Sequence, residues 1–411
     1  MPITAAPARA SSGETVKNHR ITLLSLALAL VTTAASAQVQ GAQVASSGVS
    51  QAGKVADSTA APTPEPIPNI LKDVTINAFT SMGYGYNANR PSDRVNGLRI
   101  FDRNTNSFQV DVAEVVLQKT VAKAGDLGFR VDLEAGSSIP GVTQSAGLAI
   151  GTGADLQQAF LSYVAPLGGG LRLDLGKFVT HMGLEVIEGY DGYDDNYSRS
   201  LLFNYAIPLT HTGVKAAYTF NSMVSATAMI VNGWDVAVDN NNGKSVGLQL
   251  AVVPVAPVAI FFNYMGGPEQ ANANNVRHVG DIVATYKVSE MLSLGINGDY
   301  AVETGASAVT AGQDAKWSGV AGYAKVTTDP RFYIAFRGET FKDEGGTRLG
   351  LGMNTTANEL TVTPTIKVSN NFLVRLEGRY DSINQNGVFV DDKAVSKKNQ
   401  ATIGLNAILV Y

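Results

Sequence analysis

The chain has 411 residues, of which 45% are hydrophobic, only 16% are charged and 42 are glycine. Charged residues usually make up about a quarter of a soluble globular protein, so this composition is unusual for a cytosolic enzyme. The absence of cysteine excludes a disulfide scaffold, a thiolate metal site and a cysteine nucleophile, and the net charge of −4 argues against a nucleic-acid partner.

The N-terminus predicts export. Lys17 and Arg20 precede the apolar stretch ITLLSLALALV, and an Ala-x-Ala site follows at residues 35–37. The apolar stretch is too short to span a bilayer, which needs about 20 residues. We therefore expect residues 1–37 to be a signal peptide that is cleaved after Ala37.

Residues 38–69 are rich in Pro, Ala and Ser and contain few large apolar side chains. Such a segment cannot bury enough apolar surface to offset the entropy lost on ordering. It is expected to be a flexible periplasmic leader, and a role in binding a partner stays open. The folded domain is predicted to cover residues 70–411.

From residue 70 onward, apolar and polar residues alternate with period two, which is the pattern of half-buried strands. In 372–380, FLVRLEGRY, arginine and glutamate alternate with apolar residues, and 129–134 and 292–302 repeat the pattern. The alternation in 108–119 slips near Glu114, which predicts a β-bulge there. Strands are expected near residues 74–87, 108–122, 127–134, 155–164, 171–179, 210–220, 223–232, 244–253, 258–265, 276–287, 292–302, 316–326, 331–341, 357–367, 372–380 and 399–411.

The connections between these strands alternate strictly between short and long. Short ones include AKAGD, NS and SEM, and long ones include residues 88–107, 180–209 and 381–398. An outer-membrane barrel sorts its connections in this way, with tight periplasmic turns and longer extracellular loops. The sequence therefore predicts an all-β fold: a closed transmembrane antiparallel up-and-down β-barrel of about 16 strands in the outer membrane of a Gram-negative bacterium.

The last segment, ATIGLNAILVY, is apolar on one face and ends at Tyr411. This strand is expected to close the barrel against the first strand, because an open edge in lipid leaves backbone groups unsatisfied. Tyr411 would lie in an interfacial aromatic girdle. A terminal aromatic strand also resembles the signal by which the barrel assembly machinery recognises its clients. Outer-membrane lipid and that machinery are therefore expected partners, and homo-oligomerisation stays open.

Residues 174–218 contain GKF, MGLEVIE, NYSRSLLFNYAIP and THTGVK, which together resemble the OmpL-like beta-barrel porin family. YGYNANRP at 84–91 and FQVDVAEVVLQK at 108–119 resemble the same family. The resemblance implies an outer-membrane barrel that conducts small solutes. The segment GYDGYDDN at 189–196 departs from the family pattern by its richness in Asp and Gly.

The longest internal loop, 180–209, is the predicted site of pore chemistry. In 16-stranded porins a long early loop folds inward and narrows the channel, whereas a solvated surface loop is the alternative here. The loop carries five acids against one base, which would favour cations at a narrow pore. The constriction candidates are Glu185, Glu188, Tyr190, Asp191, Asp194, Asp195, Tyr197 and Arg199.

Charges on a lipid face are costly, so the charged residues within strands are expected to face the lumen. About 16 strands enclose more cross-section than side chains fill, so these charges are expected to stay hydrated. The candidates that line the lumen are Arg130, Asp132, Glu134, Arg172, Asp174, Lys215, Asp299, Arg337, Glu339, Arg375, Glu377 and Arg379.

The sequence predicts a porin for passive diffusion of small hydrophilic solutes or ions, with a mild cation preference. No catalytic set, cofactor or metal site is expected. Asp191, Asp194 and Asp195 lack the spacing of an EF-hand, and His211 lacks a nucleophile. The alternative is a non-conducting barrel: an adhesin, a structural protein or a hydrolase at the barrel rim.

Overall fold

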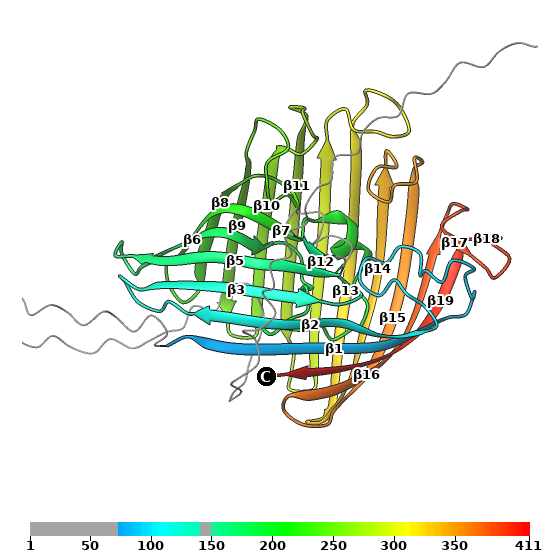
Figure 1. The fold of residues 1–411 in the computed structure, drawn as a ribbon, viewed down its shortest axis with the longest axis horizontal. Coiled ribbons are helices and arrows are strands. Elements are labelled where there is room, and N and C mark those ends of the chain that lie inside the picture. The colour runs from blue at the N-terminus through cyan, green and yellow to red at the C-terminus, as the bar shows by residue number, and fades with distance from the viewer. Residues whose placement is uncertain (1–72, 140–148, 152) are drawn as a thin grey trace, which may run out of the picture.

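The structure, a computed structural model, describes residues 73–139, 149–151 and 153–411. The expected signal peptide and leader lie outside the described residues. In the described part, antiparallel strands form one closed barrel (Figure 1). Its wall strands are β1 (Thr75–Asn87), β2 (Ser107–Lys119), β3 (Leu127–Ala135), β5 (Ala154–Ala165), β6 (Leu171–Val179), β7 (Thr210–Thr219), β8 (Val224–Val231), β9 (Ser245–Val255), β10 (Val258–Pro268), β11 (Val276–Lys287), β12 (Leu292–Glu303), β13 (Ala315–Asp329), β14 (Phe332–Glu344), β15 (Thr355–Lys367), β16 (Phe372–Ile383) and β19 (Asn399–Val410).

Three further strands are short. β4 (Ala149–Gly151) pairs with β5, and β17 (Phe389–Val390) forms a hairpin with β18 (Ser396–Lys397) in the loop before β19. The main sheet has 17 strands including β4, which leaves 16 in the wall of the described barrel. The predicted fold class is therefore confirmed, and each expected strand is present within a few residues of its predicted bounds.

The barrel closes between the last strand and the first. β19 pairs with β1, and the backbone N–H groups of Tyr411 and Ala78 each donate to the other's carbonyl, at 2.8 and 2.7 Å. In Figure 1 the C-terminus lies beside β1. Ile403 and Tyr411 expose more than half of their surface on the outer wall, whereas Ile408 is fully buried on the inner side. This closure leaves no free edge, which is what a barrel in lipid requires.

A β-bulge in β2 lies three residues before the predicted position. The pairing with β1 changes from Ser81–Val112 to Met82–Val110, so Asp111 has no partner on the neighbouring strand. The extra residue lets two consecutive side chains, Asp111 and Val112, both turn inward, and both are buried. The expected slip near Glu114 is therefore corrected to Asp111.

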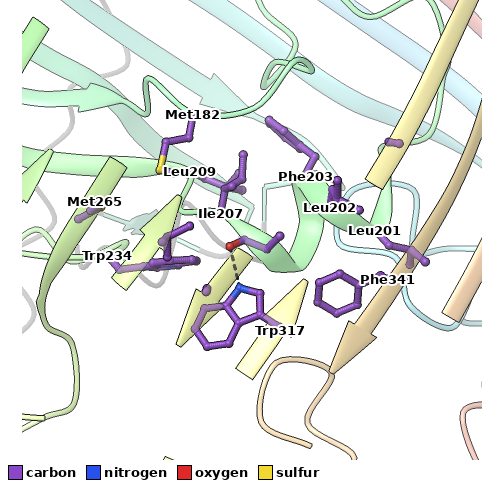
Figure 2. Close-up of a cluster of buried hydrophobic side chains, with 14 of the residues drawn as sticks. Met182, Leu201, Leu202, Phe203, Ile207, Leu209, Trp234, Met265, Trp317 and Phe341 are labelled. Atoms are coloured by element: carbon purple, nitrogen blue, oxygen red, sulfur yellow. Dashed lines mark hydrogen bonds between the residues drawn. The ribbon is translucent and has the colours of Figure 1, made fainter. Parts of the chain in front are cut away.

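The long-loop end of the barrel is filled by its own loops. A cluster of buried apolar side chains joins loop 180–209 to the inner wall (Figure 2), with the short π-helix η2 (Leu202–Ala206) at its centre. The indole N–H of Trp317 on β13 donates to the carbonyl of Ala206 at 3.0 Å. Gly319 faces Leu202, and an added Cβ would lie 2.6 Å from the Leu202 side chain. Among the described residues, no helix has the length and apolar character needed to cross a membrane.

Candidate functional site

Loop 180–209 crosses the inside of the barrel from β6 to the opposite wall. The backbone N–H of Tyr197 donates to Glu377 on β16 at 2.6 Å, and its hydroxyl donates to Asp111 on β2 at 2.9 Å. Gly83 on β1 and Gly404 on β19 make room for the ring, because an added Cβ would lie 2.4 and 2.8 Å from Tyr197 atoms. A glycine inside a strand often marks such a close approach.

Wall carboxylates hold the backbone of this loop. Glu339 on β14 accepts from the N–H groups of Leu201 and Leu202 at 2.6 and 3.1 Å. Glu114 on β2 accepts from the N–H of Tyr190 at 2.6 Å. The loop is thus fixed by hydrogen bonds to charged acceptors, which are stronger than those between neutral groups.

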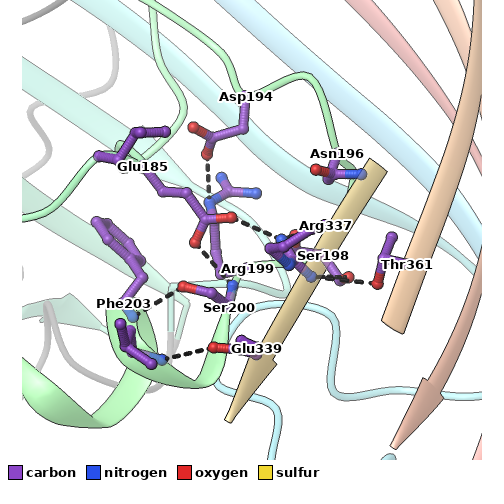
Figure 3. Close-up of polar contacts among 12 residues, drawn as sticks. Glu185, Asp194, Asn196, Ser198, Arg199, Ser200, Phe203, Arg337, Glu339 and Thr361 are labelled. Atoms are coloured by element: carbon purple, nitrogen blue, oxygen red, sulfur yellow. Dashed lines mark hydrogen bonds and ion pairs between the residues drawn. The ribbon is translucent and has the colours of Figure 1, made fainter. Parts of the chain in front are cut away.

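A second set of contacts joins charged side chains of the loop to those of the wall (Figure 3). Arg337 on β14 donates to Glu185 at 2.6 Å and to the carbonyl of Ser198 at 2.7 Å. Arg375 on β16 donates to Glu188 at 2.7 Å. Both arginine side chains are completely buried, so this interface excludes water.

All five acids of the loop are paired with bases. Glu185 pairs with Arg337, and Glu188 pairs with Arg375 and lies 3.6 Å from Arg199. The remaining ion pairs are Asp191 with Arg130, Asp194 with Arg199 at 2.8 Å, and Asp195 with Lys325 at 2.7 Å. The loop therefore presents little uncompensated negative charge.

The surroundings of two of these acids shift their pKa values in opposite directions. Burial alone would raise the pKa of Glu188, but Arg375 and Arg199 outweigh it and hold the pKa below its ordinary value. Burial raises the pKa of Asp194 well above its ordinary value, against the attraction of Arg199. Of these two acids, Glu188 is the one that its surroundings hold in the ionised form.

The twelve strand residues expected to line the lumen carry side chains on the inner side of the wall. Arg130 pairs with Asp132, Asp174 pairs with both Arg172 and Lys215, and Arg379 pairs with Asp381. Glu134 and Asp299 are both buried; neither carboxylate oxygen of Glu134 has a hydrogen-bond partner, and Asp299 lies directly opposite Asp281 on β11.

The expectation that the inward charges stay hydrated is wrong for part of the wall. The side chains of Arg337, Arg375 and Arg379 have no exposed surface, because the loop occupies the cross-section beside them. On β6 and β7 the interior is more open, since 45% of the Arg172 side chain and 23% of the Lys215 side chain are exposed.

Sequence reasoning missed several residues of this interface. Arg99 and Asp102 come from loop 88–106, and Arg99 donates to Asp381 on β16 at 2.6 Å. Asp111 was missed because the bulge changes the phase of β2. Gly83 and Gly404 carried a usable signal, since each interrupts a strand at an inward position.

The histidines do not assemble a catalytic set. His211 contacts the carbonyl of Gly233 and the hydroxyl of Thr180, each at 3.1 Å, while Asp194 contacts Arg199 and the Val186 N–H instead. Within residues 73–139, 149–151 and 153–411, no group of three or more His, Cys, Asp or Glu side chains could hold a metal ion. The absence of catalysis stays a prediction.

Residues 73–410 match the family described as "Putative beta-barrel porin-2, OmpL-like". The chain belongs to this family. The resemblance proposed from the sequence motifs is thereby confirmed, and it extends over the whole barrel. No curated protein matches the chain significantly.

Solved outer-membrane proteins share the fold of this family member at low sequence identity. The outer membrane channel DcaP of Acinetobacter baumannii has a TM-score of 0.57 and 10% identity over 82% of this chain and 97% of its own. An anion-selective porin from Comamonas acidovorans has a TM-score of 0.55 and 10% identity, covering 82% and 99%. OmpT of Vibrio cholerae has a TM-score of 0.54 and 11% identity, covering 82% and 97%.

Proposed function

We propose that this OmpL-like barrel is an outer-membrane porin through which small hydrophilic solutes diffuse passively, past a constriction made by loop 180–209. The observation that carries the proposal is the path of that loop, which crosses the lumen and is clamped to the far wall by Arg375 and Glu188. A barrel of 16 strands leaves an aqueous lumen unless something narrows it, and this loop is placed to do so.

The remaining passage runs along β6 and β7. Solvent reaches Arg172 and Lys215 there, whereas the inward charges of β14 and β16 are covered. A narrow passage of this kind would select for small solutes by size before it selects by charge.

The mild cation preference remains a proposal, and its origin differs from the one first expected. Asp191, Asp194 and Asp195 each form an ion pair, so they do not act as free charges. The barrel as a whole is mildly acidic, with 32 Asp and Glu against 27 Lys and Arg from residue 70 onward, and this excess is the better source of a negative potential.

Reversal potentials in a salt gradient test this function. The variant with Asp191, Asp194 and Asp195 all changed to Asn leaves their basic partners uncompensated, so its cation preference should fall while conductance persists. A wild-type pore that prefers anions, or a variant with an unchanged preference, would contradict the proposed selectivity.

A non-conducting barrel is the second candidate, and one observation favours it. The inward residues of β15 between Thr361 and Thr365 are fully buried, as in a dry core. An adhesin or structural barrel would give no conductance steps in a planar bilayer, even when loop 180–209 is shortened, whereas a porin would.

The surroundings of the protein also belong to this proposal. In this proposal the signal peptide 1–37 directs export, and residues 38–69 form a leader in front of the barrel. The barrel assembly machinery then recognises the last strand, which ends at Tyr411, and inserts the barrel into the outer membrane. OmpT of Vibrio cholerae has been solved in a trimer form. We extend self-association to this chain as a proposal that cross-linking in membranes would test.

A further inference from the structure

A small cavity lies between loop 180–209 and strands β2 and β3. Its volume is about 30 Å³, and its wall includes Asp111, Glu134, Ser138, Tyr197 and Arg199. A cavity holds a water molecule from roughly 10–15 Å³ upward, so this one accommodates about two particles of that size. Apolar walls alone would leave it dry, but this wall contains carboxylates.

Glu134 is the feature that requires an explanation. The residue is only 3% exposed, it lines the cavity, and neither carboxylate oxygen has a hydrogen-bond partner. A buried ionised carboxylate without a partner is strongly disfavoured, so it must either be neutral or have a counter-ion. The Asp102 Oδ1 atom, also at the cavity, is a second buried acceptor without a partner.

The neighbours of Glu134 are mostly acids, and the base whose charge attracts it, Lys177, is already bonded to other groups. Glu134 lies directly opposite Glu114 on β2 and opposite Asp155 on β5. Lys177 on β6 is bonded to Asp155 and to the carbonyl of Leu156. On its own strand, Asp132 is paired with Arg130.

Asp111, which also lines the cavity, is held by neutral donors. Its oxygens accept from the Tyr197 hydroxyl at 2.9 Å, from Asn406 at 3.2 Å and from Ser81 at 3.4 Å. Among the ion pairs of the described residues, none includes Asp111, Glu114 or Glu134. Arg199 is the one base that lines the cavity, and it is already paired with Asp194 and Glu188.

We propose that this cavity is a binding site for one compact monovalent cation, such as K⁺, with Glu134 as its principal ligand and Asp111 beside it. The cation replaces the missing partner of Glu134 and offsets the repulsion from Glu114. The cavity is large enough for such an ion and one water, and too small for a bulky organic cation. The described residues contain no group of three or more His, Cys, Asp or Glu side chains arranged to hold a metal ion, so the site rests on Glu134 as its main charge and suits a weakly coordinated ion of single charge.

Thermal unfolding tests the site without any need for conduction. The folded full-length barrel in detergent is heated in KCl or in N-methyl-D-glucamine chloride at equal ionic strength, and the heat-modifiable gel shift gives the midpoint. A ligand that binds only the folded state raises its stability, so the wild-type midpoint should be several degrees higher in KCl.

In Glu134→Gln and Glu134→Leu the difference between the two salts should disappear, because the charge that holds the cation is gone. Glu290→Gln is the matched control, since Glu290 lies in the exposed turn before β12 and pairs with Lys287. It should keep the wild-type difference. Equal wild-type midpoints in both salts, or a full difference in both Glu134 variants, would overturn the site and leave Glu134 as a neutral buried acid.

A second arm measures selectivity and rests on the proposed porin function. Removal of this charge should lower the cation-to-anion permeability ratio at least twofold in Glu134→Gln and leave it unchanged in Glu290→Gln. A wild-type barrel that gives no conductance would contradict the proposed porin function but not the cation site. The salt dependence of thermal unfolding tests the cation site separately. An unchanged ratio in a conducting Glu134→Gln barrel would show that the site does not govern permeation.

Discussion

Arg375 on β16 forms a bidentate ion pair with Glu188 of loop 180–209, in which Nη1 donates to Oε1 at 2.7 Å and Nη2 donates to Oε2 at 3.2 Å. The same Nη1 donates to the carbonyls of Asp194 and Asn196 at 2.6 and 3.0 Å, and Nε donates to Asn406 on β19 at 3.0 Å. One side chain thus ties the constriction loop to two strands at the closing seam of the barrel.

Breaking this ion pair from either side should loosen the loop, and the effects of the two changes should not be additive. Arg375→Gln leaves Glu188 buried with only Arg199 for compensation, and loss of one partner of a buried pair costs about 3–5 kcal/mol. Glu188→Gln should cost a similar amount, and the double variant less than the sum. Proteolysis within loop 180–209 measures the loosening, and strictly additive effects would contradict a direct pair.

The glycine contacts predict a position-specific effect. In Gly83→Ala the new methyl group would lie 2.4 Å from the Tyr197 hydroxyl and 2.8 Å from Asp111, so the hydrogen bond between them should break. We expect a more mobile loop and larger, noisier single-channel steps. Gly378→Ala is the control, because nothing lies within 4 Å of its added Cβ. If the two variants behave alike, Gly83 is not there to accommodate Tyr197.

The C-terminal residue should matter for assembly. Deletion of Tyr411 removes both of its backbone hydrogen bonds to Ala78 as well as the outward aromatic ring. Tyr411→Asp replaces the ring with a charged carboxylate but keeps the backbone bonds, so its defect should be smaller than that of the deletion. Heat-modifiable gel mobility reports closure, and wild-type yield from both variants would count against this role.

His181, at the start of the loop, predicts how stability depends on pH. Burial, together with the nearby His211, lowers the pKa of His181 from its usual 6.5 to about 3. Between these values the unfolded chain binds the proton and the folded chain does not, so stability falls as the pH drops below about 6.5. His181 should therefore contribute a decrease in the unfolding midpoint from pH 7.5 to pH 5, which acts against the raised pKa of Asp194.

His181→Gln removes this titrating group, so the decrease should be smaller in that variant. The slope attributable to one proton is at most about 1.4 kcal/mol per pH unit. If the variant and the wild type lose stability in parallel over this range, His181 is protonated in the folded state and the inferred burial effect is absent.

The barrel could be predicted from the sequence because the patterns that specify its strands lie within short stretches of the chain. Alternation with period two and the sorting of connections by length are properties of neighbouring residues, so Leu376 and Tyr380 could be assigned to the outer face of β16 without a structure. The inward course of loop 180–209 was expected from its length, its early position in the barrel and its charged residues.

The partners inside the barrel could not be predicted in the same way. Glu188 and Arg375 are 187 residues apart, and their contact depends on how the loop packs in three dimensions. The bulge at Asp111 moves one side chain into the cavity by a change of phase that the sequence pattern placed three residues later. The expectation of hydrated lumen charges is wrong for Arg337, because the folded loop fills the space beside it.

The central claim is that loop 180–209 narrows a conducting pore, and planar-bilayer recording tests it most directly. The purified barrel is compared with a variant in which a short Gly-Ser linker replaces residues 186–200. The account predicts small discrete conductance steps for the wild type and several-fold larger steps for the shortened loop, because the linker removes the constriction from the lumen. Silence from both proteins, or equal steps from both, would contradict the claim that loop 180–209 narrows a conducting pore.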